Sequence, residues 1–206
     1  MYIPKAFRQD DLATLHKLMR ECSFATLITQ QDGTPLATHL PFILDAERGP
    51  YGTLFGHIAR ANSQWHTFEE GQEALVIFQG PHAYITPSWY EAKLAVPTWN
   101  YAVVHAYGVP RLIEDKTVLS GLLQTLVQTY EAGFETPWTF ELLPDDYVQK
   151  MMQGIIGFEI PISRLEGKFK LSQNRPESDQ VRVAVALSDN QDELSTGVAA
   201  LMKSPK

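Results

Sequence analysis

The dipeptide Asp32-Gly33 constrains the fold of this chain more than any other local feature. It lies between the runs SFATLITQ and TPLATHLPFIL, both of which we expect to be strands. Asp-Gly between two such runs is the usual signal for a tight β-hairpin, because both residues tolerate the positive φ that the turn requires. The sequence therefore predicts that the sheet opens with two antiparallel strands.

Alternating patterns predict further strands after the hairpin. They cover residues 51–58, 73–80 together with 82–86 (one strand or a broken pair), 99–108 with an extension to Leu112 or Ile113, and 154–162.

Spacing of 3.6 residues predicts the helices. The first helix contains Leu12, Leu15, Met19 and Cys22 and has Asp10 or Asp11 as its N-cap, and a short second helix follows the turn in ARANSQWHTFEEG. A third helix over residues 116–131 has a buried stripe formed by Val118, Leu119, Leu122, Leu126 and Tyr130. A fourth begins at Pro144, and the C-terminal tail has a helical pattern in Val181, Val185, Leu194, Val198 and Leu201.

Hairpin-linked strands that precede segregated helices indicate an α+β protein. The number of strands suits a small closed antiparallel β-barrel with flanking helices. Strands and helices do not alternate in the first half, which disfavours a parallel, doubly wound sheet. A chain of 206 residues, 44% of them hydrophobic, is sufficient for one domain, although two small domains remain open. No boundary is visible before about residue 170.

The net charge of −7 argues against a broad nucleic-acid surface, because affinity for nucleic acid depends on clustered Lys and Arg. The densest basic stretch, GKFKLSQNR, contains Lys168, Lys170 and Arg175 and is sufficient for a single phosphate.

Cys22 is the only cysteine, which excludes an internal disulfide and a cysteine zinc site. No apolar run reaches the length of a membrane span, and the N-terminus MYIPKAFRQDD lacks the apolar segment of a signal peptide, so we expect a cytoplasmic protein.

The familiar catalytic and nucleotide-binding motifs are absent from the sequence. No G-x-G-x-x-G follows a strand, no G-x-x-x-x-G-K precedes a helix, and neither G-x-S-x-G nor His-Glu-x-x-His occurs. The six histidines are scattered along the chain. We therefore expect no metal site and no Rossmann-type or Walker-type nucleotide site.

The stretch FGHIARANSQW suggests an anion site. Arg60 follows an expected strand end, and Asn62 is a candidate N-cap, so a guanidinium and backbone N–H groups would converge on a phosphate-sized site. For this stretch alone, a solvated arginine beside an ordinary cap is the favoured interpretation, because caps and arginines are both common.

The stretch VPTWNYAVVHAYG suggests a site for a planar ligand. Thr98 and Asn100 are polar donors at the start of a strand in which Ala102, Val104 and Ala106 form a small, apolar face suited to a core. Together with the anion site, these residues fit a ligand with an anionic end and a planar polar end, and flavin mononucleotide (FMN) has that shape. Packing of the aromatic residues in a core or interface is the simpler alternative.

Five motifs in order, MYIPKAF, FGHIARANSQW, AYITPSWY, VPTWNYAVVHAYG and GKFKLSQNR, resemble the PaiB-type family of FMN-binding negative transcriptional regulators. The resemblance extends from Met1 to about Arg175. It implies an antiparallel split β-barrel related to the pyridoxamine-phosphate-oxidase-like flavoproteins, and a homodimer with FMN at the subunit interface. On this basis we expect a split-barrel domain over residues 1–175 and a helical extension, packed on the same domain, over 176–206.

The resemblance also implies which segments contact FMN. Carried over by position, they are Thr38, His39, Leu40, Pro41, His57, Ile58, Ala59, Arg60, Asn62, Pro97, Thr98, Trp99, Asn100 and Tyr101, with Lys168, Lys170 and Gln173 as weaker candidates.

Two other functions remain open from the sequence. The first is a flavin-dependent oxidoreductase with a nicotinamide donor, for which His57 or His105 would be proton-transfer groups. The second is a regulator that binds DNA directly. The family resemblance is the whole support for DNA binding, since the sequence contains no helix-turn-helix with a basic recognition helix.

Overall fold

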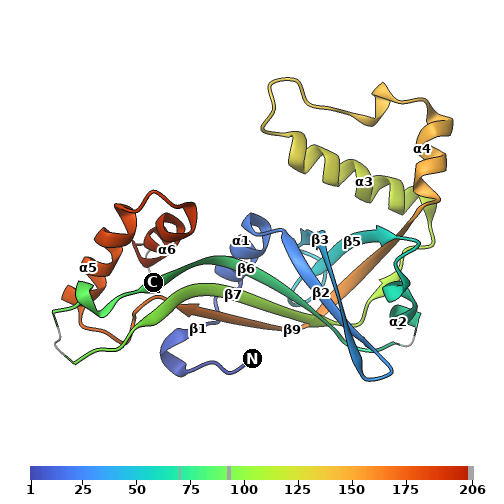
Figure 1. Ribbon diagram of the computed structural model, residues 1–206. Helices are drawn as coiled ribbons and strands as arrows, with labels where there is room; N and C mark the ends of the chain where they lie inside the picture. The colour runs from blue at the N-terminus through green and yellow to red at the C-terminus, as the bar shows by residue number, and fades with distance from the viewer. Residues whose placement is uncertain (70, 92–93, 204–206) are drawn as a thin grey trace. The chain divides into compact units, whose positions relative to one another are not determined.

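The computed structural model of the protein describes residues 1–69, 71–91 and 94–203. Within these residues the strands form a nine-stranded antiparallel sheet with the order β3-β2-β6-β7-β9-β5-β4, and β1 and β8 also pair with β9. This is the predicted α+β class (Figure 1). The strands are β1 Arg8–Gln9, β2 Phe24–Gln31, β3 Thr34–Pro41, β4 Ile43–Asp45, β5 Thr53–Ala59, β6 Ala74–Ile85, β7 Thr98–Gly108, β8 Arg111–Leu112 and β9 Ile155–Lys170.

Six α-helices and four short 3₁₀ helices accompany these strands in the described residues. They are η1 Lys5–Phe7, α1 Leu12–Glu21, η2 Ser63–Trp65, α2 His66–Glu69, η3 Pro87–Trp89, α3 Lys116–Glu131, η4 Phe140–Leu142, α4 Asp145–Met152, α5 Glu177–Ser188 and α6 Glu193–Lys203.

The chain divides into two compact units, which we describe separately. Unit 1 contains Met1–Leu18, Phe78–His105 and the chain from Glu166 onward. Unit 2 contains Met19–Ile77 and Ala106–Leu165. The strands β6, β7 and β9 contribute residues to both units. The expected division at residue 175 between a barrel and a helical extension stays a prediction.

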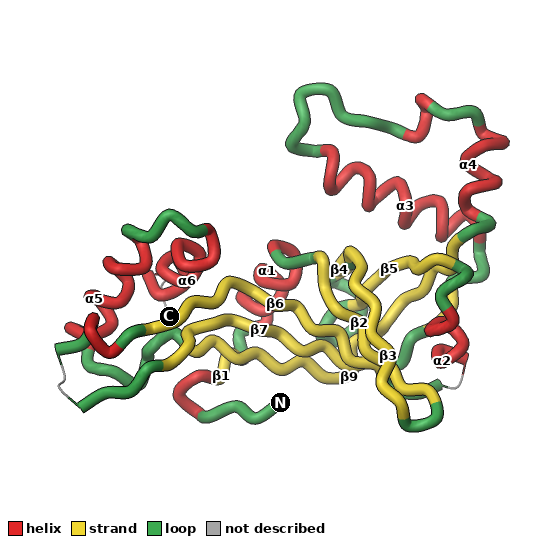
Figure 2. Tube along the Cα trace, viewed as in Figure 1, coloured by secondary structure: helices red, strands yellow, loops and turns green. Residues whose placement is uncertain are grey.

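The predicted hairpin is confirmed. Asp32 and Gly33 have φ values of 51° and 77°, as expected for the two central residues of a type I′ turn, and Gln31 pairs with Thr34 across it. Figure 2 shows the turn joining β2 and β3. This turn fixes the register that places Leu40 opposite Ala25, two buried residues.

The predicted strand pattern after the hairpin is confirmed with two refinements. β6 is one strand rather than a broken pair, and β7 ends at Gly108. Gly108 passes so close to β9 that an added Cβ would lie 2.3 Å from the carbonyl oxygen of Pro161. Pro110 then ends the strand, because it has no N–H to donate to the sheet. The expected extension to residue 112 or 113 is therefore a separate strand, β8.

β9 is longer than the sequence predicts. The expected strand over 154–162 continues to Lys170, because the ladder goes on after the apolar pattern ends. Ser163 and Arg164 are two consecutive polar residues, so the apolar–polar alternation that predicts a strand stops at residue 162. At its far end β9 pairs with β1, with Arg8 opposite Lys168. β1 itself is too short to be recognised from alternation.

The helix α3 packs in unit 2 through an apolar stripe. Asp115 caps it by accepting hydrogen bonds from the amides of Thr117 and Val118 at 2.7 and 3.4 Å. The stripe forms a buried cluster with α4, which begins after Pro144 as predicted and follows α3 along the chain (Figure 1). The members of the cluster are Leu119, Leu122, Leu126 and Met152.

The prediction that Val118 and Tyr130 belong to this buried stripe is wrong, since they are 48% and 44% exposed. They lie at the two margins of the stripe, and the hydroxyl of Tyr130 instead contacts the hydroxyl of Ser23 at 2.7 Å.

In the first helix, α1, the predicted apolar residues are also only partly buried. Leu15 and Met19 are buried as expected, whereas Leu12 at its first position is exposed. Its N-cap is Asp11, whose carboxylate accepts from the amide of Thr14 at 2.8 Å.

The tail forms the predicted helices, α5 and α6, which pack on each other in unit 1 (Figure 1). Val198 is buried as expected, but Val181, Val185 and Leu194 are exposed. The buried face of α5 instead contains Val183, Ala184 and Leu187, which share one side of the helix at this spacing. The predicted helices are therefore confirmed, and tertiary contacts bury a face of α5 other than the one that contains Val181 and Val185.

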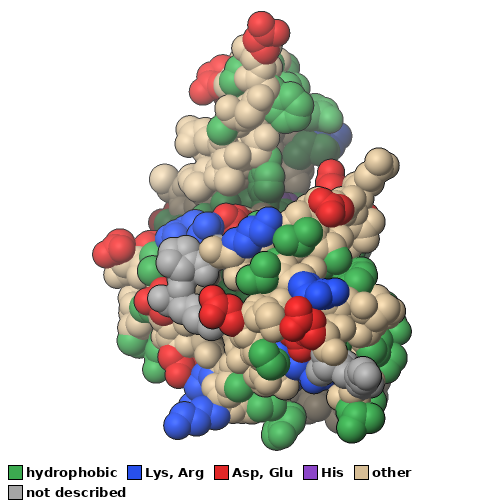
Figure 3. All heavy atoms as spheres, turned by 90° about the vertical axis from the view of Figure 1, so that its left-hand side faces the viewer, with side chains coloured by type: hydrophobic (Ala, Val, Ile, Leu, Met, Phe, Trp, Pro, Cys, Tyr) green, Lys and Arg blue, Asp and Glu red, His purple; other side chains and the backbone are tan. Residues whose placement is uncertain are grey.

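Figure 3 shows one face of the molecule with Lys and Arg side chains interspersed among Asp and Glu. This mixture agrees with the net charge of −7. Among the described residues, no helix combines the length and the apolar content needed to cross a lipid bilayer.

Candidate functional site

The first group of candidate residues lies in unit 2, on β3 and at the end of β5. The side-chain amide of Asn62 donates to the hydroxyl of Thr38 at 2.9 Å, and that hydroxyl donates to Oε1 of Gln64 at 2.5 Å. The Asn62 side chain also caps η2 by accepting from the amide of Gln64 at 3.0 Å, as predicted. The structure thus brings the segments 38–41 and 57–62 together.

Gln64 holds this group in place, and sequence reasoning missed it. The residue is 2% exposed, and its Nε2 donates to the hydroxyl of Thr29 at 3.1 Å. A buried amide with both ends bonded fixes the turn after β5 against β2 and β3. Its position two residues after the N-cap is the only sequence signal that could have indicated it.

Arg60 ties the same turn to the start of β9. Its backbone N–H donates to the carbonyl of Gly154 at 2.8 Å, and its guanidinium donates to the carbonyls of Gln153 and Ile155 at 2.8 and 3.2 Å. The indole of Trp65 donates to the carbonyl of Arg60 at 3.0 Å. The guanidinium is exposed and keeps further N–H donors for a ligand. Arg60 is therefore both a helix C-terminal cap for α4 and a candidate anion contact.

His57 is the titratable member of this group. It is half-buried on β5 opposite Gly157 of β9, and burial lowers the pKa of its imidazole below the ordinary value. Its Nδ1 is buried and has no hydrogen-bond partner. A neutral imidazole with one unused nitrogen suits a proton-transfer group or a ligand contact.

The remaining candidates of this group differ in accessibility. Leu40 and Ile58 are buried in the core, so only their backbone atoms are available to a ligand. Pro41 is half-buried, and His39 and Ala59 are exposed.

The second group of candidates lies in unit 1, where β7 begins and β9 ends. Nζ of Lys170 donates to the hydroxyl of Thr98 and, at 2.5 Å, to the carbonyl of Trp99. Burial, and then the neighbouring charges of Lys168 and Arg175, lower the pKa of Lys170. Three cations therefore lie near one another, and among the described residues none of the three pairs with a carboxylate.

Aromatic rings surround these cations. Nζ of Lys168 lies 5.4 Å from the ring centre of Tyr101 and 5.7 Å from that of Tyr2. The guanidinium of Arg175 lies 4.6 Å from the ring centre of Tyr90. Cation–π contacts of this kind orient the cations without neutralising them. The cluster Lys168, Lys170 and Arg175 therefore keeps its positive charge available, and we call it the cationic cluster.

Asn100 is 1% exposed at the start of β7. Its Nδ2 donates to the hydroxyl of Ser172 at 2.9 Å, while its Oδ1 is buried and has no partner. Gln173 folds back on its own turn, accepting from the amide of Leu171 at 2.7 Å and donating to the carbonyl of Phe169 at 2.5 Å. Gln173 thus supports the turn, and Asn100 retains an unused acceptor.

The last two candidates lie at the entry to β7. Pro97 is exposed, and Trp99 is 52% exposed. The indole of Trp99 has Tyr84 and His82 as ring neighbours at 5.9 and 6.1 Å between centres. An exposed aromatic surface next to polar donors is suited to a planar ligand.

Residues 1–164 match the family model described as "Putative FMN-binding domain". The chain belongs to this FMN-binding family. The family membership confirms the resemblance that the five motifs indicate, and it confirms FMN as the expected cofactor. In the parts of the chain that the structure describes, no group of three or more His, Cys, Asp or Glu side chains has metal-site geometry.

Relatives of this FMN-binding family cover nearly the whole chain. "Protease synthase and sporulation protein PAI 2" of Bacillus subtilis (strain 168) is 38% identical over 203 residues, which cover 98% of this chain and 97% of that protein. An uncharacterized protein of Emericella nidulans is 33% identical, with 87% of both chains covered.

Solved structures confirm the split-barrel fold of this family member. The flavocytochrome Anf3 from Azotobacter vinelandii superposes with a TM-score of 0.67 at 16% identity, covering 87% of this chain and 78% of its own. The FAD and heme binding protein from Mycobacterium smegmatis gives 0.58 at 14% identity, covering 84% and 78%. At these identities the likeness concerns the fold alone.

The chemistry of the two groups fits FMN. A phosphate requires cationic donors, which Arg60 and the cationic cluster provide, and a flavin ring requires polar contacts at its edge and flat apolar contacts on its faces. The unpartnered Oδ1 of Asn100 and the exposed ring of Trp99 correspond to those two needs. Which of these residues touch FMN stays a prediction.

Proposed function

We propose that this protein is a homodimer that binds FMN at its subunit interface, and that the candidate residues of each unit are FMN contacts. The observation that carries the proposal is the cationic cluster: Lys170 is partly desolvated beside Lys168 and Arg175, and no described carboxylate neutralises them. Like charges that crowd together are costly unless an anion joins them. FMN supplies such an anion.

In this proposal the two groups have different roles. Arg60 and the turn capped by Asn62 bind the phosphate with the guanidinium donors that the carbonyls of residues 153 and 155 leave unused. Thr98 and Asn100 orient the ring edge, and the cationic cluster stabilises negative charge on the ligand. Bound FMN supplies reversible uptake of electrons, whereas the protein supplies binding, orientation and exclusion of water.

A visible absorption spectrum of the purified protein, with and without added FMN, tests the proposal. We expect the flavin bands of bound FMN and saturable quenching of FMN fluorescence on titration. A colourless protein that leaves FMN fluorescence unchanged would refute the proposal that it binds FMN.

The homodimer has separate support and a separate test. The half-buried residues of β7 include large aromatic rings such as Tyr101, on the face opposite the buried Ala102 and Val104. Aromatic side chains of this kind are enriched at protein interfaces. Sedimentation velocity should give twice the chain mass of 23.2 kDa, and a monomer at micromolar concentration would contradict the dimer.

A cytoplasmic location also stays a prediction, which cell fractionation tests.

A flavin-dependent oxidoreductase is the second candidate function, and His57 favours it. Its lowered pKa keeps the imidazole neutral near pH 7, and the unpartnered Nδ1 leaves a nitrogen for proton transfer. Reduced nicotinamide should then bleach the bound flavin under anaerobic conditions. Persistence of the flavin bands with either nicotinamide donor would count against this function.

A regulatory role is the third candidate, and it rests on relatives. The printed name of the Bacillus subtilis relative refers to sporulation. The mixed charges in Figure 3 and the net charge of −7 do not favour a broad DNA contact. Band shifts with promoter fragments over a salt series decide the question, because phosphate contacts give a steep salt dependence.

A further inference from the structure

Unit 2 contains a cavity of about 490 Å³ that the flavin proposal does not use, apart from Arg60 at its rim. It is an open pocket, lined by the turn of η2, the junction of β8 with α3, the end of α4 and the first residues of β9. Its volume lies within the range typical of small-molecule sites, roughly 300 to 1,000 Å³. The cavity is therefore large enough for a ligand rather than only for water.

The walls of the cavity are mainly apolar. Six aliphatic or thioether side chains line it: Leu112, Ile113, Leu119, Met152, Ile155 and Ile156. The wall is tightly packed where β9 meets α3, since a Cβ added to Gly157 would lie 2.6 Å from Cδ1 of Leu119. The hollow is thus bounded by well-packed elements and does not result from a loose wall.

The polar groups of the cavity have a net positive charge. Arg60 and Lys116 are cationic, Glu114 is anionic, and Gln149 and Gln153 add amide groups. Among the described residues, neither Lys116 nor Glu114 forms an ion pair. The rim therefore combines two cations with one carboxylate, which favours a ligand with a single negative charge.

The N-terminus of α3 does not contribute to this preference. Asp115 already accepts from the amides of Thr117 and Val118, and these hydrogen bonds lower the pKa of its carboxyl group. The helix end is therefore capped by the chain itself. Any recognition of an anion must come from the side chains of Arg60 and Lys116.

We propose that this cavity binds a small carboxylic acid with an apolar body, whose chain or ring contacts the aliphatic walls and whose carboxylate pairs with Lys116. The proposal does not depend on flavin. It assigns unit 2 a second small-molecule site, which would take a substrate or an effector.

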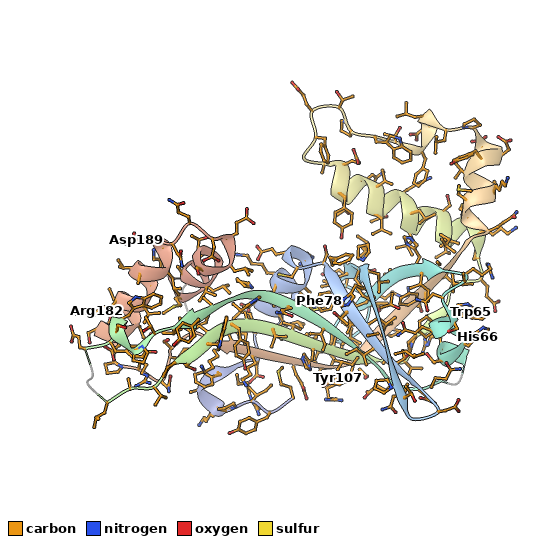
Figure 4. All side chains as sticks on the ribbon, viewed as in Figure 1. Trp65, His66, Phe78, Tyr107, Arg182 and Asp189 are labelled. Carbon is orange, nitrogen blue, oxygen red and sulfur yellow. The ribbon has the colours of Figure 1, made fainter. Side chains whose placement is uncertain are left out.

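Trp65 provides a reporter for this site, because it lines the cavity and its indole donates to the carbonyl of Arg60. Its ring lies 3.7 Å from that of His66 between centres, and Figure 4 labels the two side by side. The full-length protein is titrated with octanoate, and binding is followed by tryptophan fluorescence and by calorimetry. We expect saturable binding, with a fluorescence change that is lost in Trp65→Phe while the heat of binding remains.

Octanol and octylamine share the apolar chain of octanoate and test the charge preference. Octanoate should bind more tightly than either. Equal affinity for octanol would overturn the role of the carboxylate. Tighter binding of octylamine would show that Glu114 dominates recognition at the rim and would overturn the preference for an anion. Absence of any heat of binding with octanoate up to about 10 mM would overturn the site itself.

Two variants locate the site. Lys116→Ala should weaken octanoate about three- to fivefold, as expected for a partly solvated ion pair. Lys150→Ala is the matched control, because Lys150 is an exposed lysine of α4 outside the cavity. Leu112→Phe, which narrows the apolar wall, should also weaken octanoate. Equal affinities for Lys116→Ala and Lys150→Ala would refute the proposal.

FMN titration of the same proteins separates this inference from the proposed function. Lys116→Ala should leave FMN affinity unchanged. A protein that binds octanoate but no FMN would retain the cavity proposal and remove the flavin proposal, and the reverse result would do the opposite.

Discussion

Nε of Arg60 donates to the carbonyl oxygen of Gln153 at 2.8 Å, and this bond gives a candidate anion contact a structural role as well. We expect Arg60→Ala to weaken FMN by about 1.5 to 3 kcal/mol, the value of a charged hydrogen bond, and to lower stability because the carbonyls of residues 153 and 155 lose their donor. Arg60→Lys keeps the charge and should retain more FMN affinity. Flavin fluorescence and urea unfolding measure the two effects separately. Unchanged FMN affinity in Arg60→Ala would remove Arg60 from the site.

Lys170→Met tests the cationic cluster. We expect FMN to bind about 1 kcal/mol more weakly, because one partly exposed cation is removed. Lys5→Met, which removes an exposed lysine of the same unit, is the control and should leave affinity unchanged. Fluorescence titration measures both. The same loss in both variants would indicate a general charge effect instead of a specific contact.

Gln64→Leu tests the buried network around the turn after β5. The change leaves the hydroxyl of Thr29 without its donor and the hydroxyl of Thr38 without its acceptor, so we expect the free energy of unfolding to fall by about 2 to 3 kcal/mol. Gln128→Leu, on an exposed position of α3, should change it by less than about 0.5 kcal/mol. Urea unfolding of the two variants gives the comparison. A loss in Gln64→Leu no larger than that of the control would show that the network contributes little.

His57 should make stability depend on pH. Burial lowers its pKa in the folded state, so the unfolded state binds more protons between that pKa and the ordinary value of 6.5. Stability is therefore fully present above pH 6.5 and is lost as pH falls through the lowered pKa. In urea unfolding at a series of pH values, His57→Phe should show a smaller loss on acidification than the wild type. His39→Gln, at an exposed histidine, should behave as the wild type does.

Two glycines should respond to alanine in opposite directions. Gly33→Ala should destabilise by about 1 kcal/mol, because φ is +77° in the hairpin turn. Gly121 lies inside α3, and a Cβ there meets nothing within 4 Å, so Gly121→Ala should stabilise by about 0.5 to 1 kcal/mol. Thermal unfolding checks both signs. A stabilising Gly33→Ala would contradict the turn geometry.

The sequence was sufficient to predict elements whose signals are local. The Asp-Gly turn, the Asn62 cap and the helix after Pro144 each depend on residues a few positions apart, and all are confirmed. The hydrogen bond between Thr38 and Asn62 was not predicted, because hydrogen bonds between distant segments leave no periodic pattern in the sequence. The family resemblance implied only that both segments contact FMN.

Features that depend on long-range packing were not predictable. Gln64 is of a residue type usually found at the surface, but here it is buried against polar partners on the two strands β2 and β3. The extension of β9 beyond residue 162 pairs with β1, a strand of only two residues. On α5 the sequence offered two apolar faces, and only tertiary contacts decide between Val181 and Val183. The cavity between β8, α3, α4 and β9 has no sequence motif at all.

The uninterrupted course of β9 has an evolutionary consequence. Along its last residues, buried Gly167 and Phe169 alternate with half-buried Lys168 and Lys170. Deletion of a single residue near Ser163 would turn Phe169 outward and the two lysines toward the core. A point substitution changes one side chain and keeps the register, whereas a length change alters every later position of the strand. Length changes should therefore be purged among relatives that retain the same ligand chemistry.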